Sequence, residues 1–152
     1  MSFARSGNSP ETKATVEIAN QLSSHVYHLF ITNNKDGFLG AYHENANNVF
    51  KVILPDETND KSLAMTSSFS SMLFASYLLF GGKVSPKFFD IASSNFDWLE
   101  SQAETVSQLD FSKVFYVGTG LIGELTKEVS LKLNELTAGQ TEICLLYTSY
   151  AA

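Results

Sequence analysis

The chain has 152 residues, of which 44% are hydrophobic, and its formal net charge is −6. This length favours one domain with a packed core, and the acidic balance argues against a nucleic-acid-binding surface, which needs a concentrated basic face. The one cysteine, Cys144, cannot form a disulfide within the chain, so a reducing cytoplasm is expected. The most apolar stretch, 65–80, is too short and too rich in hydroxyl groups to span a membrane.

The first half of the chain predicts strands that alternate with helices. Val16, Ala19 and Leu22 recur at helical spacing. The near-continuous apolar run at 26–31 is typical of a strand buried in a parallel sheet. The expected order is a strand tail at 1–5, a helix over 10–23, strands over 26–31 and 49–54 with a short helical turn at 38–42 between them, and a long helix over 62–80.

The second half continues the alternation. One long helix is expected from Pro86 to about Leu109, then a strand over 114–117 and a helix over 121–137. An apolar stripe marks the last helix, formed by Leu121, Leu125, Val129 and Leu136. Strands alternating with helices predict an α/β fold with a parallel sheet.

The loop between the first strand and the first helix carries the strongest functional signal. Ser9 is a favoured N-cap and Pro10 suits the first helical position. Gly7 allows close approach of the backbone, and Ser6 and Ser9 add hydroxyl donors. A strand, a tight hydroxyl-rich loop and a helix N-terminus together predict an anion site, for which a phosphate is the natural ligand. An ordinary capped connection is the alternative.

The run Phe-Ala-Arg-Ser-Gly-Asn-Ser-Pro-Glu-Thr at 3–12 closely resembles the phosphosugar-binding loop of the SIS (sugar isomerase) domain family. The match is best with its tagatose-6-phosphate ketose/aldose isomerase branch, also described as galactosamine-6-phosphate deaminase/isomerase. The resemblance implies a three-layer αβα, flavodoxin-like fold, here incomplete at both ends. It also implies a phosphorylated sugar or amino sugar as substrate, a homodimer, and neither a metal nor an organic cofactor.

The same resemblance divides the chain into three parts. Residues 1–84 correspond to the C-terminal part of a first SIS domain, 85–112 to a helical connection, and 113–152 to the N-terminal part of a second domain. For phosphate binding it implies Arg5, Ser6, Gly7 and Ser9, joined by Thr66 at the start of the long helix. A small-residue helix face that packs on the sheet is the alternative for the segment around Thr66.

Lys132 and Glu135 match the family pattern near the end of the last helix, and their spacing places them on one helix face. An aldose–ketose isomerase moves a proton between adjacent carbons, which requires a positioned base. The resemblance implies that Glu135 is this base and that Lys132 is a supporting charge. The alternative is a solvated helix face, because Glu124 and Glu128 continue the same polar stripe.

The run Gly118-Thr119-Gly120-Leu121-Ile122-Gly123 matches the dinucleotide fingerprint Gly-x-Gly-x-x-Gly after a predicted strand. The acidic residue expected at the end of the next strand is poorly met, because Glu142 falls near the start of the last apolar run. The resemblance instead assigns Gly118, Thr119 and Gly120 to the loop of the second SIS domain. His25, His28 and His43 show no metal-ligand spacing.

The sequence departs from the family in two places. The family's Gly-x-Gly-x-Ser loop is expected upstream of Met1, and its Arg-His-Gly-Pro segment is not found after Gly139. Residues 144–152 look like translated adaptor sequence rather than this family. A sheet cut on both sides exposes strand edges and apolar faces, so a marginally folded or aggregation-prone chain is expected.

Three functions remain open from the sequence. The first is a sugar-phosphate aldose–ketose isomerase or amino-sugar-6-phosphate deaminase, which the pair Lys132 and Glu135 favours. The second is a non-catalytic SIS regulator that binds a sugar phosphate. The third is an NAD-binding domain, which rests on the glycine run alone.

Overall fold

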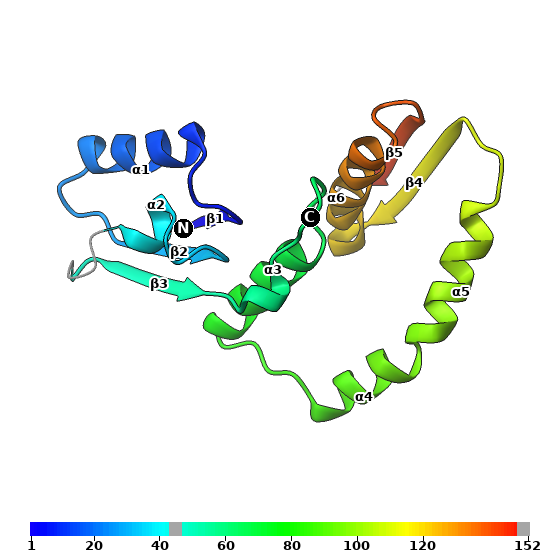
Figure 1. Cartoon of the computed structure of the whole chain (residues 1–152), viewed down its shortest axis with the longest axis horizontal. Helices are drawn as coiled ribbons and strands as arrows, with labels where there is room; N and C mark the ends of the chain where they lie inside the picture. The colour runs from blue at the N-terminus through cyan, green and yellow to red at the C-terminus, as the bar shows by residue number, and fades with distance from the viewer. Residues whose placement is uncertain (43–46, 149–152) are drawn as a thin grey trace. The chain divides into compact units, whose positions relative to one another are not determined.

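The computed structural model describes residues 1–42 and 47–148, apart from the side chains of Tyr147 and Thr148. The chain separates into two compact units, Met1–Gly82 and Lys83–Ala152 (Figure 1). Each unit contains parallel strands joined through helices, so the predicted α/β class with a parallel sheet is confirmed.

The first unit holds a three-stranded parallel sheet with the order β1-β2-β3. The strands are β1 (Ser2–Ala4), β2 (His28–Thr32) and β3 (Val49–Ile53). Ile31 lies opposite Phe3 on one side and Val52 on the other. Four of the five residues of the central strand β2 are buried, as expected for an inner strand of a parallel sheet.

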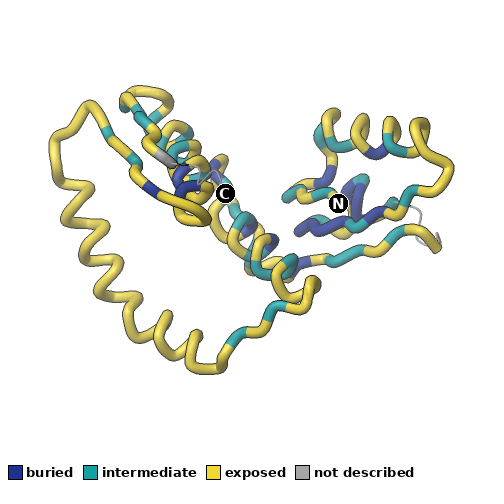
Figure 2. The backbone as a smooth tube through the Cα atoms, turned by 180° about the vertical axis from the view of Figure 1, so that it is seen from behind, coloured by how far each residue is buried: buried dark blue, intermediate teal, exposed yellow. Residues whose placement is uncertain are grey.

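Helices cover both faces of this sheet, which gives three layers. They are α1 (Pro10–Leu22), α2 (Phe38–Ala41) and α3 (Ser67–Leu79), with a 3-10 turn η1 (Asp56–Thr58) after β3. Because successive strand residues point to opposite faces, Phe30 packs with Val16 and Leu39 on one side, and Ile31 packs with Met72 on the other. Figure 2 shows the buried residues of this unit concentrated along β2.

The start predicted for the long helix is wrong by five residues. The helix was expected to begin at Ser62, but α3 begins at Ser67. The segment before it forms a turn in which the Ser62 hydroxyl donates to the carbonyl of Ala64. The carboxylate of Asp60 then binds the first amides of the helix. The hydrogen bonds of Asp60 and Ser62 thus hold residues 62–66 in a turn instead of the helical turn that was predicted there.

The single helix predicted over 86–109 is also wrong, because it is two helices. They are α4 (Pro86–Ser94) and α5 (Phe96–Ser107). Asn95 lies between them, and its backbone and side-chain amides both donate to the carbonyl of Ile91, at 3.2 and 2.8 Å. Asparagine side chains compete in this way with helical hydrogen bonds, and the helix is interrupted at this residue.

The second unit also contains a parallel strand pair joined through a helix. Its parts are β4 (Lys113–Thr119), α6 (Gly120–Leu136) and β5 (Glu142–Thr148), and the register runs from Lys113 opposite Glu142 to Thr119 opposite Thr148. Cys144 therefore lies within a strand, while 149–152 fall outside the described residues. The helix packs through the buried Gly123 and Thr126, because small residues allow a close approach to the strand.

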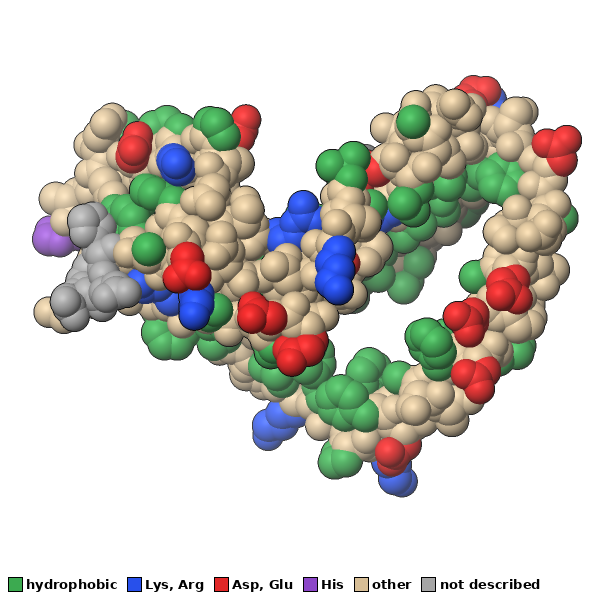
Figure 3. All heavy atoms as spheres, viewed as in Figure 1, with side chains coloured by type: hydrophobic (Ala, Val, Ile, Leu, Met, Phe, Trp, Pro, Cys, Tyr) green, Lys and Arg blue, Asp and Glu red, His purple; other side chains and the backbone are tan. Residues whose placement is uncertain are grey.

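Many apolar side chains of the second unit are exposed. The predicted stripe of α6 is part of this surface, since Leu121 is 79% exposed and Leu136 is 69% exposed. The tube of α4 and α5 is coloured as exposed along its length in Figure 2. Acidic side chains recur on α5, as Figure 3 shows. None of the described helices combines the length and the hydropathy needed to cross a membrane.

Candidate functional site

The N-terminus of α1 is capped as its sequence predicts. The Ser9 hydroxyl accepts a hydrogen bond from the amide of Thr12 at 3.2 Å, and it lies 2.8 Å from the Thr12 hydroxyl. Pro10 occupies the first turn, where a backbone N–H would have no partner within the helix, so the N–H that proline lacks is not missed as a helical hydrogen bond. The helix therefore presents its positive end to the loop that follows β1.

Gly7 is the residue that gives this loop its shape. Its φ angle is +66°, a left-handed conformation that other residues adopt at a cost. A Cβ atom there would lie 3.2 Å from the Cβ of Leu39, so α2 also packs close to this backbone. The neighbouring Ser6 hydroxyl accepts a bond from the amide of Asn8 at 3.3 Å, which tightens the turn.

Arg5 joins this loop to the segment before α3. Its Nη1 donates to the carbonyl of Ser62 at 2.7 Å and to that of Asp60 at 3.4 Å. Among the described residues, its Nε and Nη2 groups make no hydrogen bond. The guanidinium is thus held at one end, and three of its five donors remain for a ligand.

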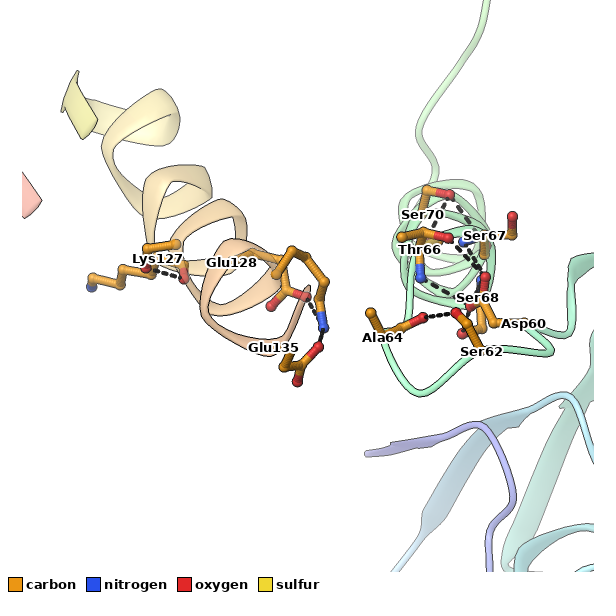
Figure 4. Close-up of polar contacts among 12 residues, drawn as sticks. Asp60, Ser62, Ala64, Thr66, Ser67, Ser68, Ser70, Lys127, Glu128 and Glu135 are labelled. Atoms are coloured by element: carbon orange, nitrogen blue, oxygen red, sulfur yellow. Dashed lines mark hydrogen bonds and ion pairs between the residues drawn. The ribbon is translucent and has the colours of Figure 1, made fainter. Parts of the chain in front are cut away.

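Thr66 lies at the start of α3, where the carboxylate of Asp60 binds the N-terminus of the helix. The Asp60 carboxylate accepts hydrogen bonds from the amides of Thr66, Ser67 and Ser68, each 2.9 Å long. The hydroxyls of Thr66 and Ser68 also donate to it, at 2.8 and 2.6 Å (Figure 4). Thr66 is therefore already engaged with a carboxylate, and its predicted contact with a phosphate stays a prediction.

The electrostatics of Asp60 follow from these contacts. Partial burial opposes ionisation of the carboxyl group, but the hydrogen bonds from Ser68, Thr66 and Ser67 outweigh it and hold the pKa of Asp60 well below its ordinary value of 3.8. Asp60 is thus ionised at neutral pH.

A polar hollow of about 270 Å³ lies beside Arg5 and Ser6, beyond the carboxyl ends of β1 and β2. Ligands of open parallel sheets bind at these strand ends. Asn33 is 2% exposed and donates to the Thr58 hydroxyl at 2.6 Å, while its Oδ1 has no partner among the described residues. The full lining consists of Arg5, Ser6, Asn33, Asn34, Lys35, Asp36, Asp56 and Asn59.

In the second unit, Lys132 lies between two carboxylates of α6. Its Nζ is 2.8 Å from Glu135 and 3.3 Å from Glu128. Figure 4 shows Glu128 and Glu135 on one side of the helix. Burial opposes the charge of Lys132, but the hydrogen bonds to Glu135 and Glu128 outweigh it and raise the lysine pKa.

The glycine run forms the turn from β4 into α6. A Cβ on Gly118 would lie 2.9 Å from the backbone of Gly123, so the strand and the helix touch here. Gly120 has a φ angle of +54°, and Thr119 makes no side-chain cap. Glu142 lies at the start of β5, where it pairs with Lys113 at 2.6 Å. It is therefore not the acidic residue that a dinucleotide ribose requires at the end of that strand.

Within each unit, the structure brings together some of the predicted site residues. Arg5, Ser6, Gly7 and Ser9 share one loop, and Arg5 reaches the segment that leads to Thr66. Lys132 and Glu135 are paired on α6. The loop at 118–120 is separated from this pair by about 18 Å along the helix, at about 1.5 Å of rise per residue.

The sequence interpretation missed two residues of these networks. Asp60 precedes its partners by six to eight positions, a spacing that no capping pattern covers. Glu128 was treated only as part of a polar stripe, although its spacing of four residues before Lys132 is a known pairing signal. The described residues contain no cluster suited to a metal, and His43 lies outside them.

No family model matches the chain. The D-galactosamine-6-phosphate deaminase AgaS of Escherichia coli O157:H7 is 39% identical over an alignment of 152 positions, which covers 92% of this chain and 38% of that protein. The protein of the same name from Shewanella sp. (strain ANA-3) is 39% identical over an alignment of 142 positions, which covers 92% of this chain and 37% of that protein.

Two solved structures are similar to the chain. The crystal structure of tagatose-6-phosphate ketose/aldose isomerase from Escherichia coli matches with a TM-score of 0.83 and 36% identity, over 97% of this chain and 41% of that one. A putative tagatose-6-phosphate ketose/aldose isomerase from Clostridium novyi NT matches with a TM-score of 0.69 and 34% identity, over 97% and 39%. The chain therefore spans about two fifths of the length of these relatives.

Proposed function

We propose that the protein is part of a sugar-phosphate isomerase or amino-sugar-6-phosphate deaminase, because its relatives carry those names and the sequence resembles the sugar isomerase (SIS) family. The relatives are named for galactosamine-6-phosphate and tagatose-6-phosphate, and both compounds are candidate ligands here. The observation that carries the proposal is the capped loop at 5–9, which stands before the positive end of α1.

The ligand phosphate would occupy this loop. Ser6 and Ser9 supply hydroxyl groups, and the left-handed Gly7 turns the backbone without a side chain in the way. Arg5 contributes the guanidinium donors that its carbonyl contacts leave unused. The sugar would extend from the phosphate into the adjacent polar hollow.

The proposed chemistry is a proton shuttle. As the resemblance implies, we assign the base of such a shuttle to Glu135 of the second unit. A base of this kind takes a proton from one carbon of an open-chain sugar, which gives an enediol or enediolamine, and returns it to the neighbouring carbon. In the deaminase reaction, hydrolysis of the resulting imine releases ammonia. Lys132, 2.8 Å from Glu135, fixes the direction of the carboxylate.

The first test measures ligand binding by NMR, from the shifts of the amide signals of the chain. Galactosamine-6-phosphate and tagatose-6-phosphate should shift the amide signals of 5–12, whereas unphosphorylated galactosamine should not. Ser6→Ala should weaken binding, because it removes a hydroxyl from the loop. Failure of both phosphorylated compounds to bind would end the proposal.

The second test separates catalysis from binding. In deuterated water, a proton shuttle exchanges hydrogen at the carbon beside the carbonyl, which NMR detects in the sugar. Glu135→Gln should abolish this exchange and keep binding, while Glu124→Gln, on the exposed side of α6, should keep both. Binding without exchange in the unmodified chain would favour the regulator function instead. A homodimer and a cytoplasmic location stay predictions.

A further inference from the structure

We propose that Asp60 is a positioning residue for the sugar-phosphate site, and that it acts by fixing the backbone carbonyls that orient Arg5. This inference rests on the proposed binding of a phosphate at the loop 5–9. It assigns a function to a carboxylate that would not touch the ligand.

The Asp60 carboxylate closes a loop rather than merely capping a helix. An ordinary N-cap residue stands directly before the helix, but Thr66, in that place, makes no side-chain cap. Asp60 is six residues from Thr66 and eight from Ser68, and it binds both. Five hydrogen bonds of 2.6 to 2.9 Å therefore hold the segment 60–66 as a closed turn.

This closed turn presents two of its carbonyl groups to Arg5. The carbonyls of Asp60 and Ser62 both accept from Nη1, and the second contact is only 2.7 Å long. A guanidinium is planar, so holding Nη1 in this way fixes where Nη2 and Nε point. Those groups belong to a residue that lines the polar hollow together with Ser6.

Charge alone predicts the opposite effect from positioning. Asp60 is an anion near a proposed anion site, so its removal should strengthen phosphate binding if only long-range electrostatics mattered. Positioning predicts that the same removal weakens binding, because Arg5 loses its fixed carbonyl partners. The sign of the effect therefore separates the two explanations.

The test compares Asp60→Asn with the unmodified chain, using galactosamine-6-phosphate and inorganic phosphate as probes. We expect Asp60→Asn to weaken binding of the sugar phosphate by roughly fivefold, as for loss of one contact in a coupled network. Glu57→Gln is the matched control, since it removes an exposed carboxylate from the neighbouring turn η1. It should leave binding unchanged or slightly stronger.

A double-mutant cycle tests the route through Arg5. In an Arg5→Gln background, Asp60→Asn should produce no further loss of binding. An equal loss in both backgrounds would overturn the inference, and so would binding by Asp60→Asn as strong as that of the unmodified chain. Ser68→Ala, which removes the 2.6 Å bond alone, is a milder variant that should give a smaller loss in the same direction.

A readout without ligand keeps this inference distinct from the proposed function. The guanidinium signals of Arg5 in the free chain should move in Asp60→Asn and not in Glu57→Gln. If the unmodified chain binds neither probe, the proposed function fails while this signal still decides the role of Asp60. If the Arg5 signals do not move in Asp60→Asn, the positioning role of Asp60 is refuted.

Discussion

The positive charge of Lys132 lies between the negative charges of two carboxylates on one face of α6. It is 17% exposed, and its partners Glu128 and Glu135 are 26% and 29% exposed. Lys132→Met should therefore lower the free energy of unfolding of the second unit, by about 0.5–1 kcal/mol for two such pairs. Urea denaturation followed through the fluorescence of Trp98, which lies in this unit, measures the change.

Lys127→Met provides the comparison at the same scale. The pair of Lys127 with Glu124 is 2.7 Å long but much more exposed, at 47% and 63%. Its loss should change the free energy of unfolding by less than the loss of Lys132, because solvent screens exposed pairs. A larger effect at Lys127 would contradict the account of Lys132.

At the level of elements, Gly118 decides how closely α6 packs on β4. A side chain at Gly118 would meet the backbone of Gly123 at 2.9 Å, and backbone cannot move aside as a flexible side chain can. Gly118→Ala should destabilise the second unit by about 1–3 kcal/mol, the usual cost of overpacking. Denaturation monitored at Trp98 would show it.

Gly120→Asn is the control for this element. Gly120 has a positive φ angle but open space around it, and asparagine tolerates that conformation better than most residues. The change should be small. Equal destabilisation by both variants would mean that the conformation of the turn matters and the close approach does not.

The elements also show what the sequence could predict and what it could not. The apolar run before Thr32 and the Ser9-Pro10 signal predicted β2 and the start of α1, because both depend on neighbouring residues. The start of α3 depends on Asp60, whose partners lie across a turn, and the break at Asn95 depends on one side-chain amide. The site was predictable as a loop, but the link from Arg5 to Ser62 joins residues that only the fold brings together.

For the whole molecule, acid should destabilise the first unit through Asp60. The folded pKa of Asp60 lies below its unfolded value of 3.8, so between the two values the unfolded chain binds more protons. The contribution of Asp60 to stability is then complete above about pH 4 and is lost as the pH falls through the folded pKa. NMR signals of the first unit should show this loss, and Asp60→Asn should reduce its pH dependence.

The exposed apolar surface predicts behaviour of the whole molecule in solution. Phe88 and Phe89 on α4 are 53% and 56% exposed, and Trp98 on α5 is 60% exposed. Exposed apolar patches favour association. Sedimentation should therefore show self-association that grows with concentration, and a Phe88→Gln, Phe89→Gln double variant should show less. A monomer at all concentrations would contradict this prediction.

The contact between Arg5 and Ser62 also bears on the order of folding. It joins residues 57 positions apart, whereas the strand pairings of the first unit connect strands that follow one another along the chain. Closing a longer loop costs more entropy, so this contact is expected to form after the sheet has assembled. Arg5→Gln should then accelerate unfolding and leave the folding rate almost unchanged, as stopped-flow measurements can determine. The contact between Arg5 and Ser62, which would orient the ligand-binding arginine, would thus also slow the unfolding of the first unit.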